Sequence, residues 1–331
     1  MAKQEWNVAR LRRDTAYWRT AILITAVGLD LFAWIGKRAP TASRAAAHFG
    51  GAAAGWEVFL NALCGMGLLC KRAGKFSNTP FAGRYLQGAE AAAIRPAYDA
   101  WNRWGALAAS LTTGWRPKTE QPFATDRAQA QRLLAGLQYH AERIAPHLLD
   151  KLSLAGCRTL LDVGGGLGTF AAAFCRRYPA LRATLVEHPN IIPLTRKALR
   201  DSRMTKQIRL IGLDFSRQQL PRGFDAVLAS NILHARGAAA NRRLLAELYR
   251  CLNAGGQLIL RDVFLDGART APEWGTLFSV SLLLHTPQGR CYALEEIVGW
   301  LRQAGFSSIS APRRSSPLPF DPDSLLIADK R

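Results

Sequence analysis

The chain has few cysteines, and they do not form the pattern of a metal or redox site. Its six cysteines in 331 residues include no C-x-x-C pair and no spacing typical of zinc ligands. The sequence therefore predicts no metal centre. Unpaired thiols are typical of a reducing compartment such as the cytoplasm.

Long hydrophobic runs are also missing. The longest apolar stretch, Ala21–Ile35, contains Asp30 and is too short to span a bilayer. After the basic start of the chain it imitates the apolar part of a signal peptide, but no small-residue cleavage site follows it. We therefore expect a buried helix here, a cytoplasmic protein and no stable membrane insertion.

Acidic residues are scarce, since 24 Asp and Glu stand against 44 Lys and Arg, a formal net charge of +20. The excess is diffuse: residues 1–150 carry +9 and residues 151–331 carry +11. A protein that follows a nucleic-acid backbone gathers its basic residues in an arm or a stripe, so we predict no nucleic-acid partner. Long-range attraction of an acidic substrate or of a membrane surface stays open.

The first part of the chain has helical spacing and contains no internal repeat or low-complexity linker. Three predicted helices are followed by two short strands around a turn, which is typical of a winged-helix-like unit. The predicted elements are helices at Leu23–Phe32, Thr41–His48 and Gly55–Leu69 and strands at Leu68–Arg72 and Gly74–Ser77. A second helical region, Tyr98–Leu152, is expected to break near Gly114–Pro122.

From Thr159 onward, strands and helices alternate, which predicts an α/β fold with a doubly wound, Rossmann-like parallel sheet. A tail helix and an antiparallel pair of strands at one edge of the sheet complete the pattern. The expected strands are 159–163, 183–187, 208–213, 224–230, 257–264, 307–311 and 324–329, and the expected helices are 168–177, 190–200, 239–252 and 294–303.

A glycine loop lies between the first of these strands and its helix. Gly164, Gly166 and Gly168 follow the strand that contains Asp162. Glycine permits a tight strand-to-helix turn and lets a ligand lie on the backbone. The dinucleotide fingerprint needs its third glycine at position 169, where Thr stands. The loop therefore disfavours a nicotinamide cofactor, and a plain turn between strand and helix is the alternative.

Polar or aromatic residues end the following strands. Because ligands bind outside the carboxyl ends of parallel strands, these residues are expected to converge. Glu187 ends the second strand, Asp214 and Phe215 end the third, and Ser230 ends the fourth. An acid such as Glu187 suits ribose hydroxyls, and a carboxylate beside a ring suits adenine.

These motifs resemble those of the S-adenosylmethionine-dependent O-methyltransferase family, which includes plant caffeate-type and bacterial polyketide and carotenoid enzymes. The matching stretches are 161–168, 213–215, 230–234, 254–262, 265–267 and 304–306. The resemblance implies a winged-helix-like dimerisation domain (1–95) that does not bind DNA, a helical linker (96–152), a catalytic domain (153–331) and a homodimer. It also implies S-adenosyl-L-methionine contacts from Gly164, Gly166, Glu187, Asp214, Phe215 and Ser230.

The resemblance also implies that His234 is the general base and that Asp262 is an acid that orients it. A base helps because a phenol with a pKa near 10 is scarcely ionised at neutral pH. The chain departs from the family at two points. Ala235 and Arg236 replace the Asp-Trp that usually follows the base, and Cys291 stands where a second acid is expected.

The acceptor pocket is expected between the linker and the catalytic domain, lined by aromatic faces that hold a planar molecule. Such residues at helical spacing also occur as ordinary core. The expected lining residues are Trp101, Trp104, Tyr139, His140, Phe278 and His285, with Tyr98, Trp274 and Leu282 beside them.

We therefore predict a methyltransferase that acts on a hydroxyl of an aromatic or polyketide-like metabolite. One alternative is carbon or nitrogen methylation of a tetrapyrrole or alkaloid-like metabolite. Another is a homologue that binds the cofactor without methylating. A winged-helix DNA-binding regulator is disfavoured, because its recognition helix would be Gly55–Leu69, which has no Lys or Arg for phosphates and base edges.

Overall fold

The computed structural model describes residues 17–117, 127–310 and 325–331. The chain divides into two compact units, Met1–Trp101 and Asn102–Arg331, which are described separately. The predicted three-part division at residues 95 and 152 stays a prediction.

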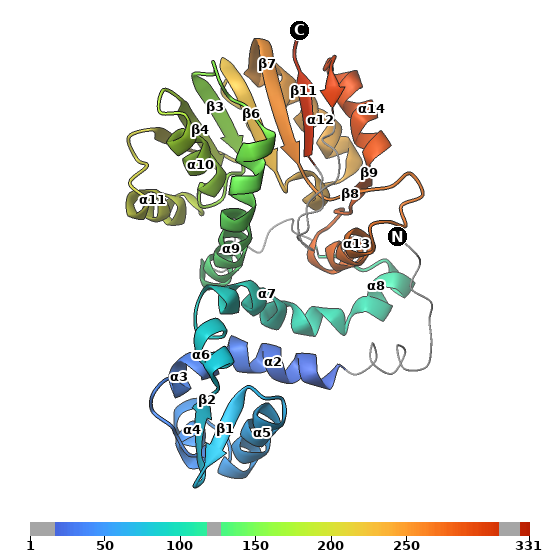
Figure 1. Ribbon diagram of the computed structural model, residues 1–331. Coiled ribbons are helices and arrows are strands. Elements are labelled where there is room, and N and C mark those ends of the chain that lie inside the picture. The colour runs from blue at the N-terminus through green and yellow to red at the C-terminus, as the bar shows by residue number, and fades with distance from the viewer. Residues whose placement is uncertain (1–16, 118–126, 311–324) are drawn as a thin grey trace. The chain divides into compact units, whose positions relative to one another are not determined.

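The first unit is a small helical body with one β-hairpin (Figure 1). Its hairpin is antiparallel, with Leu69 opposite Asn78. Its buried core is apolar, and Phe32, Leu60 and Phe76 are among its largest side chains. The expected order of helices followed by a hairpin is thus present. The elements are α2 (Trp18–Gly28), α3 (Leu31–Ile35), α4 (Ala42–Phe49), α5 (Ala53–Gly65), β1 (Leu69–Arg72), β2 (Lys75–Asn78) and α6 (Pro80–Tyr85).

The prediction of one helix over Leu23–Phe32 was wrong. Asp30 has a φ of 55°, in the left-handed region, and separates α2 from α3. Aspartate tolerates this conformation better than most residues, and its carboxylate pairs with Arg95. The segment is nevertheless buried as expected, with Val27 and Ile35 in the core. Within the described residues, no helix is long and apolar enough to cross a membrane.

The second helical region begins earlier and breaks more often than expected. It consists of α7 (Ala89–Trp104), α8 (Leu107–Thr113) and α9 (Arg127–Lys151). The predicted break near Gly114 is present, because Gly114 ends α8 with a φ of 69°. Residues 118–126 lie outside the described part of the chain.

The second unit is built on a seven-stranded sheet in the order β10-β11-β7-β6-β3-β4-β5 (Figure 1). The strands from β5 to β7 in this order are parallel, whereas β11 pairs antiparallel with both β7 and β10. This confirms the doubly wound sheet and the antiparallel pair at one edge. The strands are β3 (Thr159–Val163), β4 (Arg182–Glu187), β5 (Ile208–Gly212), β6 (Phe224–Ser230), β7 (Leu252–Arg261), β10 (Ile309–Ser310) and β11 (Leu325–Asp329).

Helices cover both faces of this sheet. The side chains of each face belong to a separate buried cluster, together with side chains of the helices on that face. One cluster contains side chains of α12 (Ala238–Cys251) and α14 (Leu294–Ala304). The other contains side chains of α9, α10 (Thr169–Arg177) and α11 (Ile192–Asp201). The carboxyl edge of the parallel strands is therefore the edge that can hold a ligand.

Both boundaries of the predicted strand Gln257–Phe264 were wrong. β7 starts at Leu252 and stops at Arg261. Beyond it, the Asp262 carboxylate accepts hydrogen bonds from the backbone amides of Leu233 (2.7 Å) and Val263 (2.7 Å). These bonds turn the chain out of the sheet. A separate parallel pair, β8 (Phe264–Leu265) and β9 (Tyr292–Ala293), follows, with α13 (Glu273–His285) between its strands.

Candidate active site

The glycine loop makes the turn from β3 into α10. Gly164, Gly166 and Gly168 have φ angles of 65°, 56° and 83°, a region that residues with a side chain rarely adopt. Gly165 is required for a different reason: a Cβ there would lie 2.7 Å from the Asp162 carboxylate. The loop therefore exposes backbone where a ligand can approach closely.

Glu187 closes one side of this loop. Its carboxylate accepts hydrogen bonds from the backbone amides of Gly166 (2.9 Å) and His188 (2.7 Å). Burial raises the pKa of Glu187, although these hydrogen bonds oppose the rise. The Thr195 hydroxyl holds the loop from the other direction by donating to the Gly166 carbonyl at 2.7 Å. The structure thus brings two of the predicted cofactor contacts together.

Asp162 lies beneath the loop as a second buried carboxylate. It is 1% exposed, and within the described residues its Oδ2 atom has no hydrogen-bond partner. Burial, reinforced by the charge of Glu187, raises its pKa to about 7. An acid directly before a glycine loop was an available signal for this residue, but Asp162 was not among the predicted site residues.

Asp214 and Phe215 follow β5, and Ser230 ends β6, as expected. The Asp214 carboxylate accepts hydrogen bonds from the amide of Ser216 (3.0 Å) and from its hydroxyl (2.5 Å). Burial alone would raise the pKa of Asp214, but these bonds leave it lowered. The Phe215 ring lies near Gly164 on one side, and the Arg236 guanidinium lies 4.7 Å from the ring centre.

His234 and Asp262 form a directly bonded pair. The His234 Nδ1 atom lies 2.6 Å from Asp262 Oδ1, and the Asp262 carboxylate also accepts hydrogen bonds from three backbone amides. Burial raises the pKa of Asp262, but the nearby imidazole and these hydrogen bonds outweigh it, so the pKa is lowered. Asp262 is therefore ionised at neutral pH.

Two of the residues that depart from the family pattern, Cys291 and Arg236, are buried. Cys291 is buried, and burial together with the charge of Asp262 raises the pKa of its thiol to about 12. A neutral thiol thus stands where a second carboxylate was expected. Arg236, in place of a tryptophan, is buried with its guanidinium over Phe215.

Only some of the residues predicted to line the acceptor pocket lie near the His234–Asp262 pair. Phe278 of α13 contacts the His234 ring edge-on, with ring centres 5.0 Å apart, and Trp274 stacks on Phe278. His285 at the end of the same helix bonds the Ser281 carbonyl of its own preceding turn (2.8 Å), and burial lowers its pKa.

The other predicted acceptor residues lie on α7 and α9. On α9, the rings of Tyr139 and His140 meet edge-on. Trp101 and Trp104 are exposed on α7, and Tyr98 packs against Gly28 within the first unit. None of these contacts tests the pocket assignment, which stays a prediction.

Arg261 lies at the same edge of the sheet and was not among the predicted site residues. It ends the apolar strand β7, is 6% exposed, and its Nη1 lies 3.4 Å from the Ser230 hydroxyl. The available signal was its position, because a charged residue at the carboxyl end of a strand lies at the edge where such sheets bind ligands.

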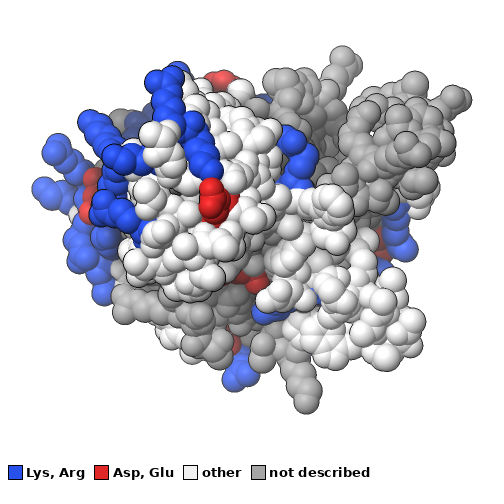
Figure 2. Space-filling view, turned by 90° about the horizontal axis from the view of Figure 1, so that it is seen from below, with Lys and Arg blue, Asp and Glu red and all other residues white. Residues whose placement is uncertain are grey.

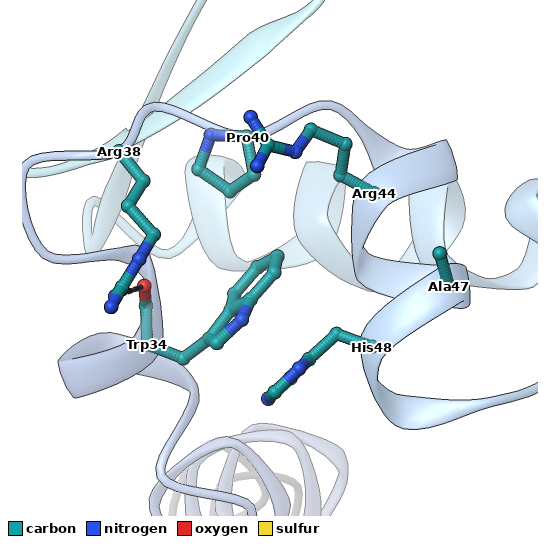
Figure 3. A pocket seen from close by; sticks show the side chains of 6 residues that line it. All are labelled: Trp34, Arg38, Pro40, Arg44, Ala47 and His48. Atoms are coloured by element: carbon teal, nitrogen blue, oxygen red, sulfur yellow. Dashed lines mark hydrogen bonds between the residues drawn. The ribbon is translucent and has the colours of Figure 1, made fainter.

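A separate hollow lies in the first unit (Figure 3). Trp34 stacks on His48 there, and the exposed Arg38 and Arg44 flank them. Its volume of about 280 Å³ is below the roughly 300–1,000 Å³ of most ligand pockets. Within the described residues, no group of His, Cys, Asp and Glu could hold a metal ion.

Comparison with protein families finds two matching models. The O-methyltransferase domain matches residues 119–307, and the O-methyltransferase dimerisation domain matches residues 15–88. Among characterised proteins, the chain is similar to 3-hydroxy-5-methyl-1-naphthoate 3-O-methyltransferase of Streptomyces sahachiroi, with 30% identity, covering 92% of this chain and 90% of that protein. It is also 30% identical to the tetracenomycin polyketide synthesis 8-O-methyl transferase of Streptomyces glaucescens, over 97% and 96% of the two chains.

Solved structures share the fold over the full length. An O-methyltransferase family protein from Burkholderia thailandensis has a TM-score of 0.82 at 23% identity, covering 99% of both chains. Human N-acetylserotonin methyltransferase, in complex with S-adenosylmethionine, has a TM-score of 0.79 at 22% identity, covering 100% of this chain and 99% of that one.

The doubly wound sheet, its glycine loop and the acids at its strand ends define the class I methyltransferases. The chain belongs to the O-methyltransferase family, and it is an S-adenosylmethionine-dependent methyltransferase.

Proposed function

We propose that S-adenosylmethionine binds at the glycine loop and that a hydroxyl of an aromatic or polyketide-like small molecule accepts its methyl group. When bound, this cofactor supplies a methyl group on a positively charged sulfur. The proposed contacts are Gly164, Gly166, Glu187, Asp214, Phe215 and Ser230.

The two buried carboxylates at the loop support this ligand over a dinucleotide. Asp162 and Glu187 are close enough that the charge of Glu187 helps to raise the pKa of Asp162. A pyrophosphate placed here would meet two acids in a medium of low dielectric constant. S-adenosylmethionine would instead bring a positively charged ammonium and sulfonium, and ribose hydroxyls that donate hydrogen bonds.

The observation that carries the proposed reaction is the 2.6 Å contact between His234 and Asp262. Because Asp262 is ionised, the proton of the imidazole is held on Nδ1, which leaves Nε2 as the acceptor. An acceptor hydroxyl that donates to Nε2 would lose its proton as the methyl bond forms. A base in this position recovers part of the roughly 4 kcal/mol that ionising a phenol costs at neutral pH.

The acceptor class is supported by the contacts of the base and by the relatives. Phe278 and Trp274 place aromatic faces beside His234, and such faces hold planar molecules. The two relatives at 30% identity are named for a hydroxynaphthoate and for tetracenomycin polyketide synthesis. We assign Trp104, Tyr139, His140 and His285 to the same pocket.

Labelled S-adenosylmethionine, incubated with the enzyme and a panel of hydroxynaphthoates, naphthols and tetracyclic polyketides, tests this function. We expect an O-methylated product, located by mass spectrometric fragmentation. A methyl group found on carbon or nitrogen would overturn the proposal, as would the absence of transfer to every phenol in the panel. Nitrogen is a real alternative, because a relative at 25% identity is the N,N-dimethyltransferase OxyT of Streptomyces rimosus.

Replacing Glu187 by alanine should weaken binding of S-adenosylhomocysteine by about 10- to 150-fold, the range for losing hydrogen bonds to a charged group. Asp214→Ala should also weaken it. Isothermal titration calorimetry measures both, with Glu57→Ala as control because Glu57 pairs with Lys71 in the first unit. Wild-type affinity in both site variants would mean that the cofactor lies elsewhere.

We propose that residues 1–95 form a homodimer interface in the cytoplasm. This unit leaves Trp18, Val58 and Phe81 exposed, and Figure 2 shows a face on which broad areas have neither Lys, Arg, Asp nor Glu. Light scattering should give twice the 36.3 kDa of the chain. Val58→Glu should shift the protein toward monomer, whereas Lys75→Glu, at the exposed first residue of β2, should not. A wild-type monomer at micromolar concentration would contradict this proposal.

A further inference from the structure

A compact basic patch lies at the amino edge of the sheet in the second unit, where α10 and α11 end and β4 and β5 begin. Residues 176–206 contain eight Lys or Arg against two acids, a net charge of +6. Part of the charge that is diffuse along the sequence is thus gathered at one place in the folded unit. The basic patch consists of six exposed residues: Arg176, Arg177, Arg182, Arg200, Arg203 and Lys206.

Hydrogen bonds join the segments that contribute to this patch. The Arg182 side chain donates to the Pro179 carbonyl at 2.9 Å, and the Arg176 side chain donates to the Ser202 carbonyl at 3.5 Å. The Gln207 side chain also donates to the Pro179 carbonyl, at 3.1 Å. The residues that precede β4 therefore lie against those that precede β5, so the six basic side chains share one region of the surface.

The positive charges of the basic patch are not neutralised by acids of the described chain. No ion pair between described residues involves any of the six, and the side-chain bonds of Arg176 and Arg182 go to neutral carbonyls. Of the two acids in this stretch, Glu187 lies at the opposite edge, beside the glycine loop, and Asp201 is one exposed charge at the end of α11. Positive charges gathered in this way attract an anionic partner.

The composition of this surface favours lipid headgroups over a protein or a nucleic acid. A protein interface has a core of apolar and aromatic anchors, but none of the large hydrophobic side chains exposed in the described chain lies between residues 176 and 206. The patch is confined to one corner of the sheet, whereas a nucleic-acid backbone is followed by an arm or a stripe. A cluster of about four to eight Lys and Arg is typical of binding to anionic lipids.

We propose that the basic patch binds the anionic headgroups of a membrane surface, reversibly and without insertion into the bilayer. The guanidinium groups match headgroup phosphates, because each presents a fork of donors. The glycine loop lies at the carboxyl edge of the same strands, so the bound protein keeps its site open on the side away from the lipid. The attraction adds up over the six charges and is screened by salt.

Co-sedimentation with lipid vesicles tests this proposal on the full-length protein. One set of vesicles contains phosphatidylglycerol and phosphatidylcholine in equal parts, and the other contains phosphatidylcholine alone. Wild type should bind only the anionic vesicles. It should be released as salt rises from about 0.1 M to about 1 M, because the Debye length falls from about 10 Å to about 3 Å.

Neutralising half of the basic patch should weaken binding to the anionic vesicles by about 100-fold, from about fivefold for each basic residue. This variant combines Arg200→Gln, Arg203→Gln and Lys206→Gln. The matched control removes the same charge from other exposed positions by combining Arg72→Gln, Lys75→Gln and Arg243→Gln, and it should bind the vesicles like wild type. Circular dichroism verifies that both variants are folded.

Three outcomes would overturn the proposal. One is the absence of vesicle binding by wild type. Another is an equal loss in both variants, which would mean that net charge alone attracts the protein, or no loss in the patch variant. The third is tighter binding to duplex DNA than to anionic vesicles, lost in the patch variant, which would assign the patch to a nucleic acid instead.

Discussion

Replacing His234 by glutamine is expected to lower kcat by about 10²- to 10⁴-fold, the usual contribution of a general base, with little change in cofactor affinity. The glutamine amide can still donate to Asp262 but cannot accept a proton at neutral pH. The loss therefore falls on the transition state and not on ground-state binding. Steady-state rates with an accepted phenol and calorimetry with S-adenosylhomocysteine measure the two quantities separately.

His147→Gln is the matched control, because His147 is an exposed histidine of α9. It should keep wild-type turnover. If His234→Gln also keeps most of its turnover, transfer depends on proximity alone, which can contribute about 7–11 kcal/mol when alignment is good. His234 would then be a structural residue.

Replacing Asp262 by alanine is expected to lower both turnover and stability. The carboxylate accepts hydrogen bonds from the amides of Leu233, His234 and Val263 and bonds the His234 ring. Its removal leaves these buried donors without an acceptor, and breaking a buried charged pair costs about 3–5 kcal/mol. Urea denaturation should show a free energy of unfolding lower by about that amount, and kcat should fall because the imidazole is no longer oriented.

The stabilisation from Asp262 should also depend on pH with a defined sign. Its pKa is lower in the folded state than in the unfolded chain, so its contribution is complete above the ordinary pKa of aspartate and is lost as pH falls through the lowered value. The difference in stability between wild type and Asp262→Ala should therefore shrink in acid. Cys291→Ala is the control, since its thiol is neutral throughout this range. A difference that does not change with pH would contradict the ionised pair.

Much of the site could be predicted because it is made of strand ends. Parallel strands place their carboxyl ends on one edge, so a glycine loop after β3, Glu187 after β4 and Ser230 after β6 must converge once the strands are recognised. The hydrogen bond between Glu187 and Gly166, 21 residues apart, shows that these two strand ends meet. The pairing of His234 with Asp262 was expected only from family resemblance, because residue spacing does not give the direction of a side chain.

The sequence by itself determined the alternation of strands and helices, the glycine turn and the residues at the strand ends, since these depend on local periodicity and backbone freedom. The tertiary structure decided which charges are desolvated. Asp162 and Arg261 look like ordinary charged residues of a strand in the sequence. Both are buried in the folded chain, and β7 ends at Arg261. Burial depends on contacts between distant segments, so no local pattern could reveal that these two charges are buried.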